Sequence, residues 1–283
     1  MVAKKSHVRW SVEQRLEFIE FCLFWEGGIN RSDLIKFFNI SVPQASKDLS
    51  QYQELAQENI CYDKSVKKYF PSKEFKPKFF TPDSDEYLRQ LYLEQDNKAS
   101  VFPYVDVMPI PYRRIDSSIL QRIINTIREQ ASIEILYQSM NDQKPDPIWR
   151  RITPHAFGSD GLRWHTRAFC HDDKKFKDFI LSRTLDVRNP EATNVSRQQD
   201  SEWNDTFEVV LIPNPKLGDN QQKIIAHDYN MEDGCSRINI RRALLYYFRK
   251  RLRLDIAEAL DNPKEAPVII KNREKFEAAI IGS

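Results

Sequence analysis

Apolar residues recur at helical spacing along the first segment of the chain. Over residues 11–26 they return every three or four positions, as on one face of an amphipathic helix. Ser11 stands three positions before Gln14, which is the spacing of a capping box at a helix start. Gly27-Gly28 follows the last apolar position and ends the predicted helix.

A short second helix and a third helix with a polar face follow. Asn30 or Ser32 is suited to cap the second helix. Ser41 stands three positions before Gln44, and Pro43 falls in the first turn of the third helix, where its missing N–H costs nothing. The third helix has one apolar face and one face of hydrogen-bonding side chains. The apolar face has Ala45, Leu49 and Tyr52 or Gln53, and the polar face has Gln44, Ser46, Lys47, Asp48 and Ser50. This order of elements predicts a helix-turn-helix.

The segment after the third helix alternates as a β-hairpin does. Residues 60–62 and 66–70 flank a turn at Asp63-Lys64. Six lysines and one glutamate lie between Lys64 and Lys78, a local charge of +5 (six minus one) in a chain of formal net charge +2. Such a hairpin is suited to contact phosphates as the wing of a winged helix. The alternative is a three-helix interaction module with a solvated basic loop.

The third helix and the hairpin predict a DNA-contacting surface within a winged-helix domain at 1–80. Gln44 and Lys47, early in the helix, are chemically suited to adenine and guanine edges respectively. The residues expected to contact DNA are Ser41, Gln44, Ser46, Lys47, Lys64, Lys67 and Lys68.

Residues 81–130 are interpreted as a helical connector. A proline-punctuated stretch, Pro103 to Pro111, suits a linker, and the domain boundary is placed near it. Ser117 or Ser118 is suited to cap a further helix over 119–130.

From residue 132 the apolar period changes from that of a helix to that of a strand. Turn signals separate the alternating segments, and four or five short antiparallel strands predict a small β-barrel over residues 131–190. Residues 200–283 are expected to form an α+β unit. Its predicted elements are a strand over 206–212, a helix over 221–226, a strand over 235–240, a helix over 241–259 and a strand over 268–270.

Composition narrows the function classes. The near-zero net charge excludes uniform coating of nucleic acid, and seven glycines form neither of the phosphate-binding glycine motifs of nucleotide enzymes. No stretch reaches the ~18 apolar residues of a membrane helix, so we expect a soluble, cytoplasmic protein without a membrane partner. Its four cysteines are expected to be reduced thiols, mostly buried.

Several sequence blocks resemble a known family. Four blocks are similar to the WYL domain of bacterial transcriptional regulators: Ile135 to Ser139, Arg151 to His155, Arg163 to Phe169 and Phe179 to Arg183. Residues 29–34 and 46–52 resemble the winged helix of the same family, in particular the repressors encoded beside phage-defence operons such as BREX and CBASS. The tripeptide that names the domain reads Trp164-His165-Thr166 here.

The resemblance implies an SH3-like or Sm-like barrel that senses a nucleotide or nucleic acid. By motif it implies these ligand-binding residues: Tyr137, Ser139, Arg151, His155, Trp164, Arg167 and Arg183. Strand alternation places His165, Arg167 and Phe169 on one face, and Phe179, Leu181 and Arg183 on one face. Guanidinium groups among aromatic rings suit phosphate contact and base stacking. The alternative is that both arginines form structural salt bridges and Trp164 belongs to the core.

Other chemistries have weaker support. The histidines and Cys170 match no common zinc spacing, so no metal or cofactor is expected. Arg237, Arg241, Arg242, Arg249, Lys250, Arg251 and Arg253 form a basic run without an acid. We interpret this run as a solvated helix face and interface rim rather than a second DNA surface.

The whole pattern predicts a multidomain α+β protein that is not an enzyme. Resemblance and motif order together predict a homodimeric repressor of an inverted-repeat, double-stranded operator, modulated by a ligand at its WYL domain and autoregulating a phage-defence operon. The alternatives are an activator of the same architecture and a nucleic-acid-processing enzyme.

Overall fold

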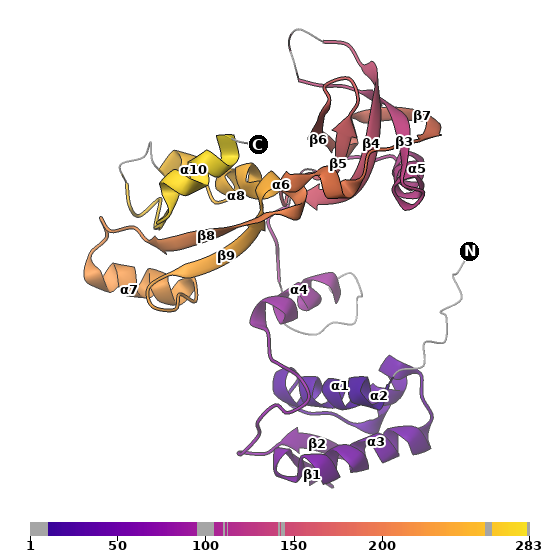
Figure 1. Cartoon of the computed structure of the whole chain (residues 1–283). Coiled ribbons are helices and arrows are strands. Elements are labelled where there is room, and N and C mark those ends of the chain that lie inside the picture. Colours follow the sequence, from indigo (N-terminus) through magenta and orange to yellow (C-terminus); the bar gives the residue numbers. More distant parts are fainter. Residues whose placement is uncertain are drawn as a thin grey trace. The chain divides into compact units, whose positions relative to one another are not determined.

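The computed structural model describes residues 11–94, 105–109, 111, 113–140, 142, 145–257 and 262–281. The chain divides into two compact units, residues 1–108 and 109–283 (Figure 1). Within the predicted linker Pro103 to Pro111, residues 103, 104 and 110 lie outside the described residues, as does the end of the predicted helix at Ala259.

The first unit contains the predicted winged helix. Ser11 and Asn30 cap its first two helices with complete capping boxes, and Ser41 caps the third. The Gln44 side chain does not return to Ser41, so the third cap is not a reciprocal box; its amide is bonded to Asp48 instead. The elements are α1 (Val12–Trp25), α2 (Arg31–Phe38), α3 (Val42–Leu55), η1 (Gln57–Asn59), β1 (Ile60–Asp63) and β2 (Lys68–Pro71).

One buried carboxylate joins helix α1 to the segment after the wing. Glu20 is fully buried, and its Oε1 accepts a hydrogen bond of 2.9 Å from the Tyr52 hydroxyl. Its Oε2 accepts from the backbone N–H groups of Lys78, Phe79 and Phe80. These bonds satisfy the buried charge and fix the chain's path across the helices.

Helix α4 (Ser84–Glu94) packs on the end of α1. The rings of Tyr87 and Trp25 stack with centroids 4.3 Å apart, and the Tyr87 hydroxyl donates to Glu26 Oε1 at 2.8 Å. This part of the predicted connector therefore belongs to the winged-helix unit.

The second unit begins with α5 (Ser117–Arg128), which packs Ile119 and Ile123 against a sheet. Asp116, rather than Ser117 or Ser118, caps α5, since its carboxylate accepts from the next residues' N–H groups. The sheet has the order β6-β5-β4-β3-β7 and is antiparallel. Its strands are β3 (Ala131–Tyr137), β4 (Ile148–Ser159), β5 (Trp164–Cys170), β6 (Lys175–Ile180) and β7 (Thr184–Ala192).

The predicted closed barrel is not confirmed. Among the described residues, β6 and β7 remain the two edges of an open sheet. Residues 181–183 form a 3-10 turn, η2, rather than the end of a strand. The predicted alternation of Phe179, Leu181 and Arg183 is therefore wrong, because side chains no longer alternate beyond Ile180.

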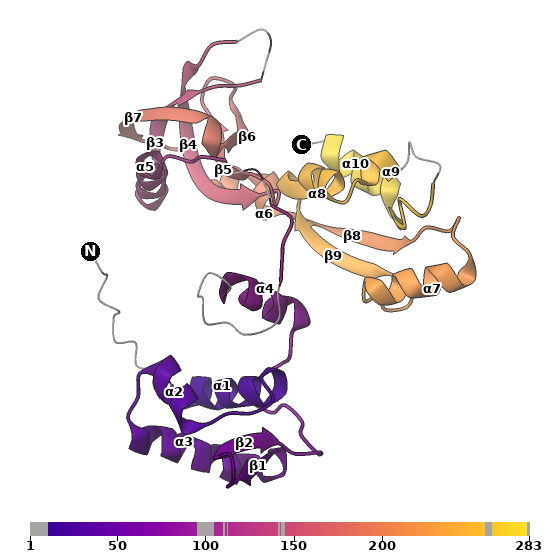
Figure 2. The same cartoon turned by 180° about the vertical axis from the view of Figure 1, so that it is seen from behind.

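The C-terminal part forms a three-stranded antiparallel sheet of order β10-β8-β9. Helices α8 and α10 lie along this sheet (Figure 2), where Leu245 and Phe276 join Val209 in a buried cluster. The elements are η3 (Arg197–Gln199), α6 (Ser201–Asn204), β8 (Thr206–Pro213), α7 (Asp219–Asp228), β9 (Ser236–Arg241), η4 (Arg242–Leu244), α8 (Leu245–Arg251), α9 (Leu254–Ala257), β10 (Val268–Ile270) and α10 (Arg273–Ile281).

Two predictions about this part need correction. The single helix expected over 241–259 is broken into η4, α8 and α9, and Arg253 takes a left-handed φ of 54° at the break between α8 and α9. The cysteines are free, but only Cys22 and Cys170 are buried, while Cys61 is exposed.

Candidate functional site

The predicted DNA-contacting residues of α3 lie at its first two turns. Lys47 is exposed, whereas Ser46 is half-buried and its hydroxyl bonds to Val42 O at 3.0 Å. Arg31 Nη1 donates to Ser46 Oγ at 3.4 Å. Asp48, which the helical pattern placed on the polar face, is fully buried instead. A buried arginine, Arg15 of α1, accounts for this difference because it pairs with the carboxylate at 2.7 Å.

The wing presents its lysines at the hairpin turn. Lys64 and Lys67 are exposed, and Lys68 is half-buried with its Nζ 5.7 Å from the Phe70 ring centroid. Asp63 Oδ1 accepts from the backbone N–H of Ser65 at 2.7 Å and orders the turn. The wing and α3 belong to one compact unit, so the wing lysines and Lys47 are held by the same folded domain.

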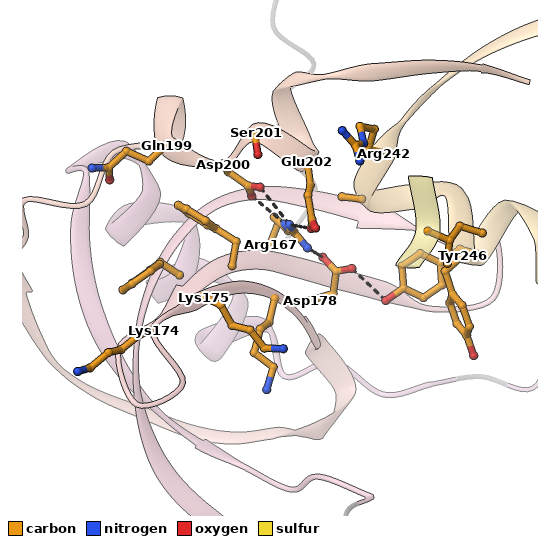
Figure 3. Close-up of a pocket in the computed structure, with 16 residues that line it drawn as sticks. Arg167, Lys174, Lys175, Asp178, Gln199, Asp200, Ser201, Glu202, Arg242 and Tyr246 are labelled. Carbon is orange, nitrogen blue, oxygen red and sulfur yellow. Dashed lines mark hydrogen bonds and ion pairs between the residues drawn. The ribbon is translucent and has the colours of Figure 1, made fainter. Parts of the chain in front are cut away.

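A second cluster centres on Arg167 of β5. Its Nε and Nη2 donate to the two carboxylate oxygens of Asp200 at 2.8 and 3.0 Å. Nη2 also contacts Glu202 at 2.6 Å, and Nη1 lies 3.5 Å from Asp178. Only 5% of the Arg167 side chain and 1% of the Asp200 side chain are exposed. Three carboxylates thus surround one buried guanidinium (Figure 3).

A β-bulge brings His155 to the same carboxylate. The pairing of β4 with β5 shifts register between Pro154 and Ala156, so His155 is the extra residue of the bulge. Its Nε2 lies 2.9 Å from Asp200 Oδ2. Among the predicted ligand residues, His155 and Arg167 therefore converge.

Burial and ion pairing shift several pKa values here. Burial opposes ionisation of Asp200, but hydrogen bonds from His155 and Arg167 outweigh it and hold the Asp200 pKa at about 2. Burial raises the pKa of Asp178, although Arg167 and Tyr247 act against this rise. Burial also lowers the pKa of His165 and favours its neutral form.

The Arg167 cluster extends into the C-terminal part through a tyrosine. The Tyr247 hydroxyl of α8 donates to Asp178 Oδ2 at 3.0 Å. The Tyr247 ring stacks on His165 with centroids 4.8 Å apart. Strands β5 and β6 are thereby connected to helix α8.

A cavity of about 650 Å³ opens beside this cluster. Arg167 and its three carboxylate partners line the cavity, together with basic side chains and aromatic rings (Figure 3). The basic and aromatic lining residues include Lys174, Lys175, Phe176, Arg242 and Tyr246. Its volume is in the range of small-molecule sites.

The remaining predicted ligand residues are spread over the sheet. Tyr137 is buried in the core, where its hydroxyl accepts from the N–H of Ile180. Arg151 donates to Asn189 O at 2.8 Å and pairs with Glu191 at 3.2 Å. Neither residue joins the Arg167 cluster. The same is true of Trp164, Ser139 and Arg183.

Trp164 is 55% exposed, which contradicts the alternative that it belongs to the core. Ser139 and Arg183 are half-buried, and Arg183 O accepts from the N–H of Gln138 at 3.1 Å. The ion pairs of Arg167 with Asp178, Asp200 and Glu202 match the alternative that this arginine forms structural salt bridges.

Sequence reasoning missed the acidic half of the cluster. Asp178, Asp200 and Glu202 come from strand β6 and from the segment between the two sheets, and Tyr247 comes from α8. Asp178 lies directly opposite Arg167 in the register of β5 and β6. Pairing the two predicted strands across their turn is the signal that could have found it. Nothing local marks Asp200, which is 33 positions away from Arg167.

The C-terminal basic run is largely paired within the chain. Arg249 contacts Glu277 at 2.8 Å, Lys250 contacts Asp255 at 2.5 Å and Arg237 contacts Glu208 at 3.1 Å. Arg241 lies 5.0 Å from the Trp203 ring centroid. These contacts balance part of the run's charge within the chain, and the interpretation as a solvated helix face and interface rim stays a prediction.

Neither a metal-binding cluster nor a membrane-spanning helix occurs among the described residues. No group of three or more His, Cys, Asp or Glu residues is placed to hold a metal ion within that part of the chain. Among the helices that the structure describes, none is both long and apolar enough to cross a membrane.

Three domain families match consecutive parts of the chain. Residues 11–93 match the winged helix-turn-helix domain of the BrxR transcriptional regulator. Residues 118–189 match the WYL domain, and residues 206–276 match the C-terminal dimerization domain of BrxR.

Relatives that align over nearly the whole chain are DNA-binding transcriptional repressors named CapW. The DNA-binding transcriptional repressor CapW of Escherichia coli (strain KTE188) is 37% identical, over 98% of this chain and 94% of that protein. CapW of Stenotrophomonas maltophilia is 37% identical over 95% and 92% of the two chains. CapW of Pseudomonas aeruginosa is 38% identical over 98% and 94%.

Proposed function

Because the chain belongs to the CapW and BrxR family of winged-helix WYL transcriptional regulators, we propose that it is a homodimeric repressor of double-stranded operator DNA. The observation that carries this proposal is the position of exposed Lys47 on α3 together with the lysine wing in one compact unit. Helix α3 enters the major groove, and the wing contacts phosphates. A two-fold dimer presents two such units, so the operator is an inverted repeat.

The effector site of this proposal is the cavity beside Arg167. Lys174, Lys175 and Arg242 supply cationic groups, and Phe176 and Tyr246 supply aromatic faces. Phosphates bind guanidinium and ammonium groups, and bases stack on aromatic rings, so a nucleotide or oligonucleotide fits this lining.

Effector binding is coupled to the C-terminal part through the carboxylates. An anionic ligand that reaches Arg167 competes with Asp200 and Glu202, which lie in the segment that leads to β8. Displacement of these carboxylates changes how the WYL sheet is held to the part that matches a dimerization domain. The coupling requires that the ligand bind the DNA-competent and DNA-incompetent dimers with different affinities.

A gel-shift titration with DNA from upstream of the protein's own gene tests the DNA-binding proposal. We expect a specific complex that weakens with salt, and we expect Lys47→Ala to lower affinity and relax the base preference at the contacted position. Lys223→Ala removes an exposed charge from α7 and is the matched control, expected to bind as the wild type does. Absence of binding by the wild type at low salt would overturn the proposal.

A reporter fused to the same upstream DNA distinguishes repression from activation. Deletion of the gene is expected to raise reporter expression. A fall in expression would assign activation to the same architecture.

A further inference from the structure

Gln44 of α3 is held by a buried ion pair that extends from α1. Its amide Nε2 donates to Asp48 Oδ1 at 2.9 Å. Asp48 is fully buried and receives Arg15 Nε at 2.7 Å and Nη2 at 3.2 Å. The Gln44 backbone N–H is bonded to the Ser41 cap. Both the backbone and the side chain of Gln44 are thus constrained.

The direction of this hydrogen bond fixes the orientation of the amide. An ionised carboxylate only accepts hydrogen bonds, so the Gln44 group that faces Asp48 is the amino group. The Gln44 carbonyl oxygen therefore points away from Asp48. The reverse orientation would place this oxygen against the carboxylate and lose the bond.

The major groove distinguishes bases by donors and acceptors. Adenine and cytosine present exocyclic amino donors, whereas guanine and thymine present carbonyl acceptors at the corresponding positions. Gln44 is the third residue of α3, in the N-terminal part of the helix where recognition residues contact base edges.

We propose that Asp48, held by Arg15, orients Gln44 so that its carbonyl oxygen selects a base with an exocyclic amino group, adenine or cytosine, in each operator half-site. Adenine is the preferred partner because its N7 also accepts the remaining amide hydrogen. Gln44 is then the specificity-determining residue and Asp48 is its positioning residue. This inference rests on the proposed DNA-binding function.

Selection from a randomised duplex library with the full-length protein tests the inference. The wild type is expected to enrich adenine or cytosine at one position of each half-site, and Gln44→Ala is expected to lose this preference alone. In the selected duplex, replacement of the contacted adenine by purine, which lacks the amino group, is expected to weaken wild-type binding about tenfold. If cytosine is selected, replacing it with thymine provides the corresponding comparison.

Asp48→Asn gives a sharper test. The new amide keeps its oxygen toward Arg15 Nε and places its amino group where Oδ1 stood, so the 3.2 Å hydrogen bond from Arg15 Nη2 is lost and the amino group donates to Gln44. Gln44 then rotates and presents its own amino group. The preference at that position is then expected to change to guanine or thymine. Gln53→Ala, an exposed glutamine farther along α3, is the control and is expected to leave the selected sequence unchanged.

The outcomes separate this inference from the proposed function. A wild type that enriches no sequence and binds no DNA contradicts DNA binding itself. A wild type that selects an operator, with Gln44→Ala retaining every base preference, overturns the inference alone. So does a folded Asp48→Asn variant with unchanged preference. If circular dichroism shows Asp48→Asn to be unfolded, Gln44→Ala and the base replacement decide.

Discussion

The hydroxyl of Tyr247 donates a hydrogen bond of 3.0 Å to Oδ2 of Asp178 and joins helix α8 to strand β6. The same Asp178 lies 3.5 Å from Arg167, which also pairs with Asp200. A contact in the C-terminal part is thereby connected to the cavity beside the WYL sheet. In the proposed mechanism this connection carries effector occupancy toward the dimerization part.

Tyr247→Phe is expected to weaken this connection without unfolding the protein. The ring keeps its stacking on His165, while the loss of one hydrogen bond leaves Asp178 less satisfied and costs about 1 to 2 kcal/mol. Thermal unfolding measures the cost, and gel shifts with added nucleotide or oligonucleotide measure the response. We expect operator affinity to be unchanged and effector response to be reduced. A variant with wild-type stability and wild-type response would contradict the role of this contact.

Arg167→Ala is expected to destabilise the protein strongly. It leaves Asp178, Asp200 and Glu202 without their common cation, and an uncompensated buried charge costs about 3 to 5 kcal/mol. Arg183→Ala, at a half-buried arginine of η2, is the comparison and is expected to cost under about 1 kcal/mol. Urea unfolding of both variants provides the measurement. Equal stability of the two variants would mean that the Arg167 ion pairs contribute nothing.

Acidification is expected to remove the stability that Asp200 contributes. The Asp200 pKa is held at about 2 in the folded protein, against 3.8 as its ordinary value. A lowered folded-state pKa stabilises the fold above pH ~4, and this contribution is lost as pH falls from about 4 to 2, by about 2 kcal/mol. Urea unfolding over this range should show a loss that is about 2 kcal/mol larger in the wild type than in Asp200→Asn, because carboxylates such as Asp173 titrate in both. Parallel pH curves would contradict the assignment.

Gly28→Ala is expected to displace the wing, because Gly28 has a φ of +142° and an added Cβ would lie 2.5 Å from Tyr69 O. That oxygen accepts the N–H of Ile29, so the clash opposes the contact between the first helices and strand β2. The expected cost is about 2 to 3 kcal/mol, with weaker operator binding.

Gly27→Ala provides the control for this clash. Gly27 also has a positive φ, +66°, but an added Cβ meets nothing within 4 Å. It is expected to cost only about 1 to 2 kcal/mol for the left-handed backbone and to bind DNA normally. Equal effects of both changes on melting temperature and DNA binding would show that contact with β2 is unimportant.

Local sequence determined much of the secondary structure. Ser11 caps its helix as its spacing predicts, and Asn30 is the one of the two candidates that caps the second helix. The hairpin forms where the alternating pattern and turn residues place it. These features depend on interactions between residues a few positions apart, so periodicity and capping chemistry are sufficient to locate them. The lysine wing and the basic C-terminal run were likewise visible as charge along the chain.

Only the tertiary structure decided which charged groups meet. Asp48 reads as a polar surface position on its helix, yet Arg15, 33 positions earlier, makes it a buried ion pair. Asp200 has no local signal, and it reaches Arg167 and His155 because of a bulge in β4 and the path of the chain after β7. Strand register, the bulge and the chain's return path arise from packing of distant segments. The sequence therefore determined most of the elements and the family, whereas folding determined the ion pair beside Gln44 and those that surround Arg167.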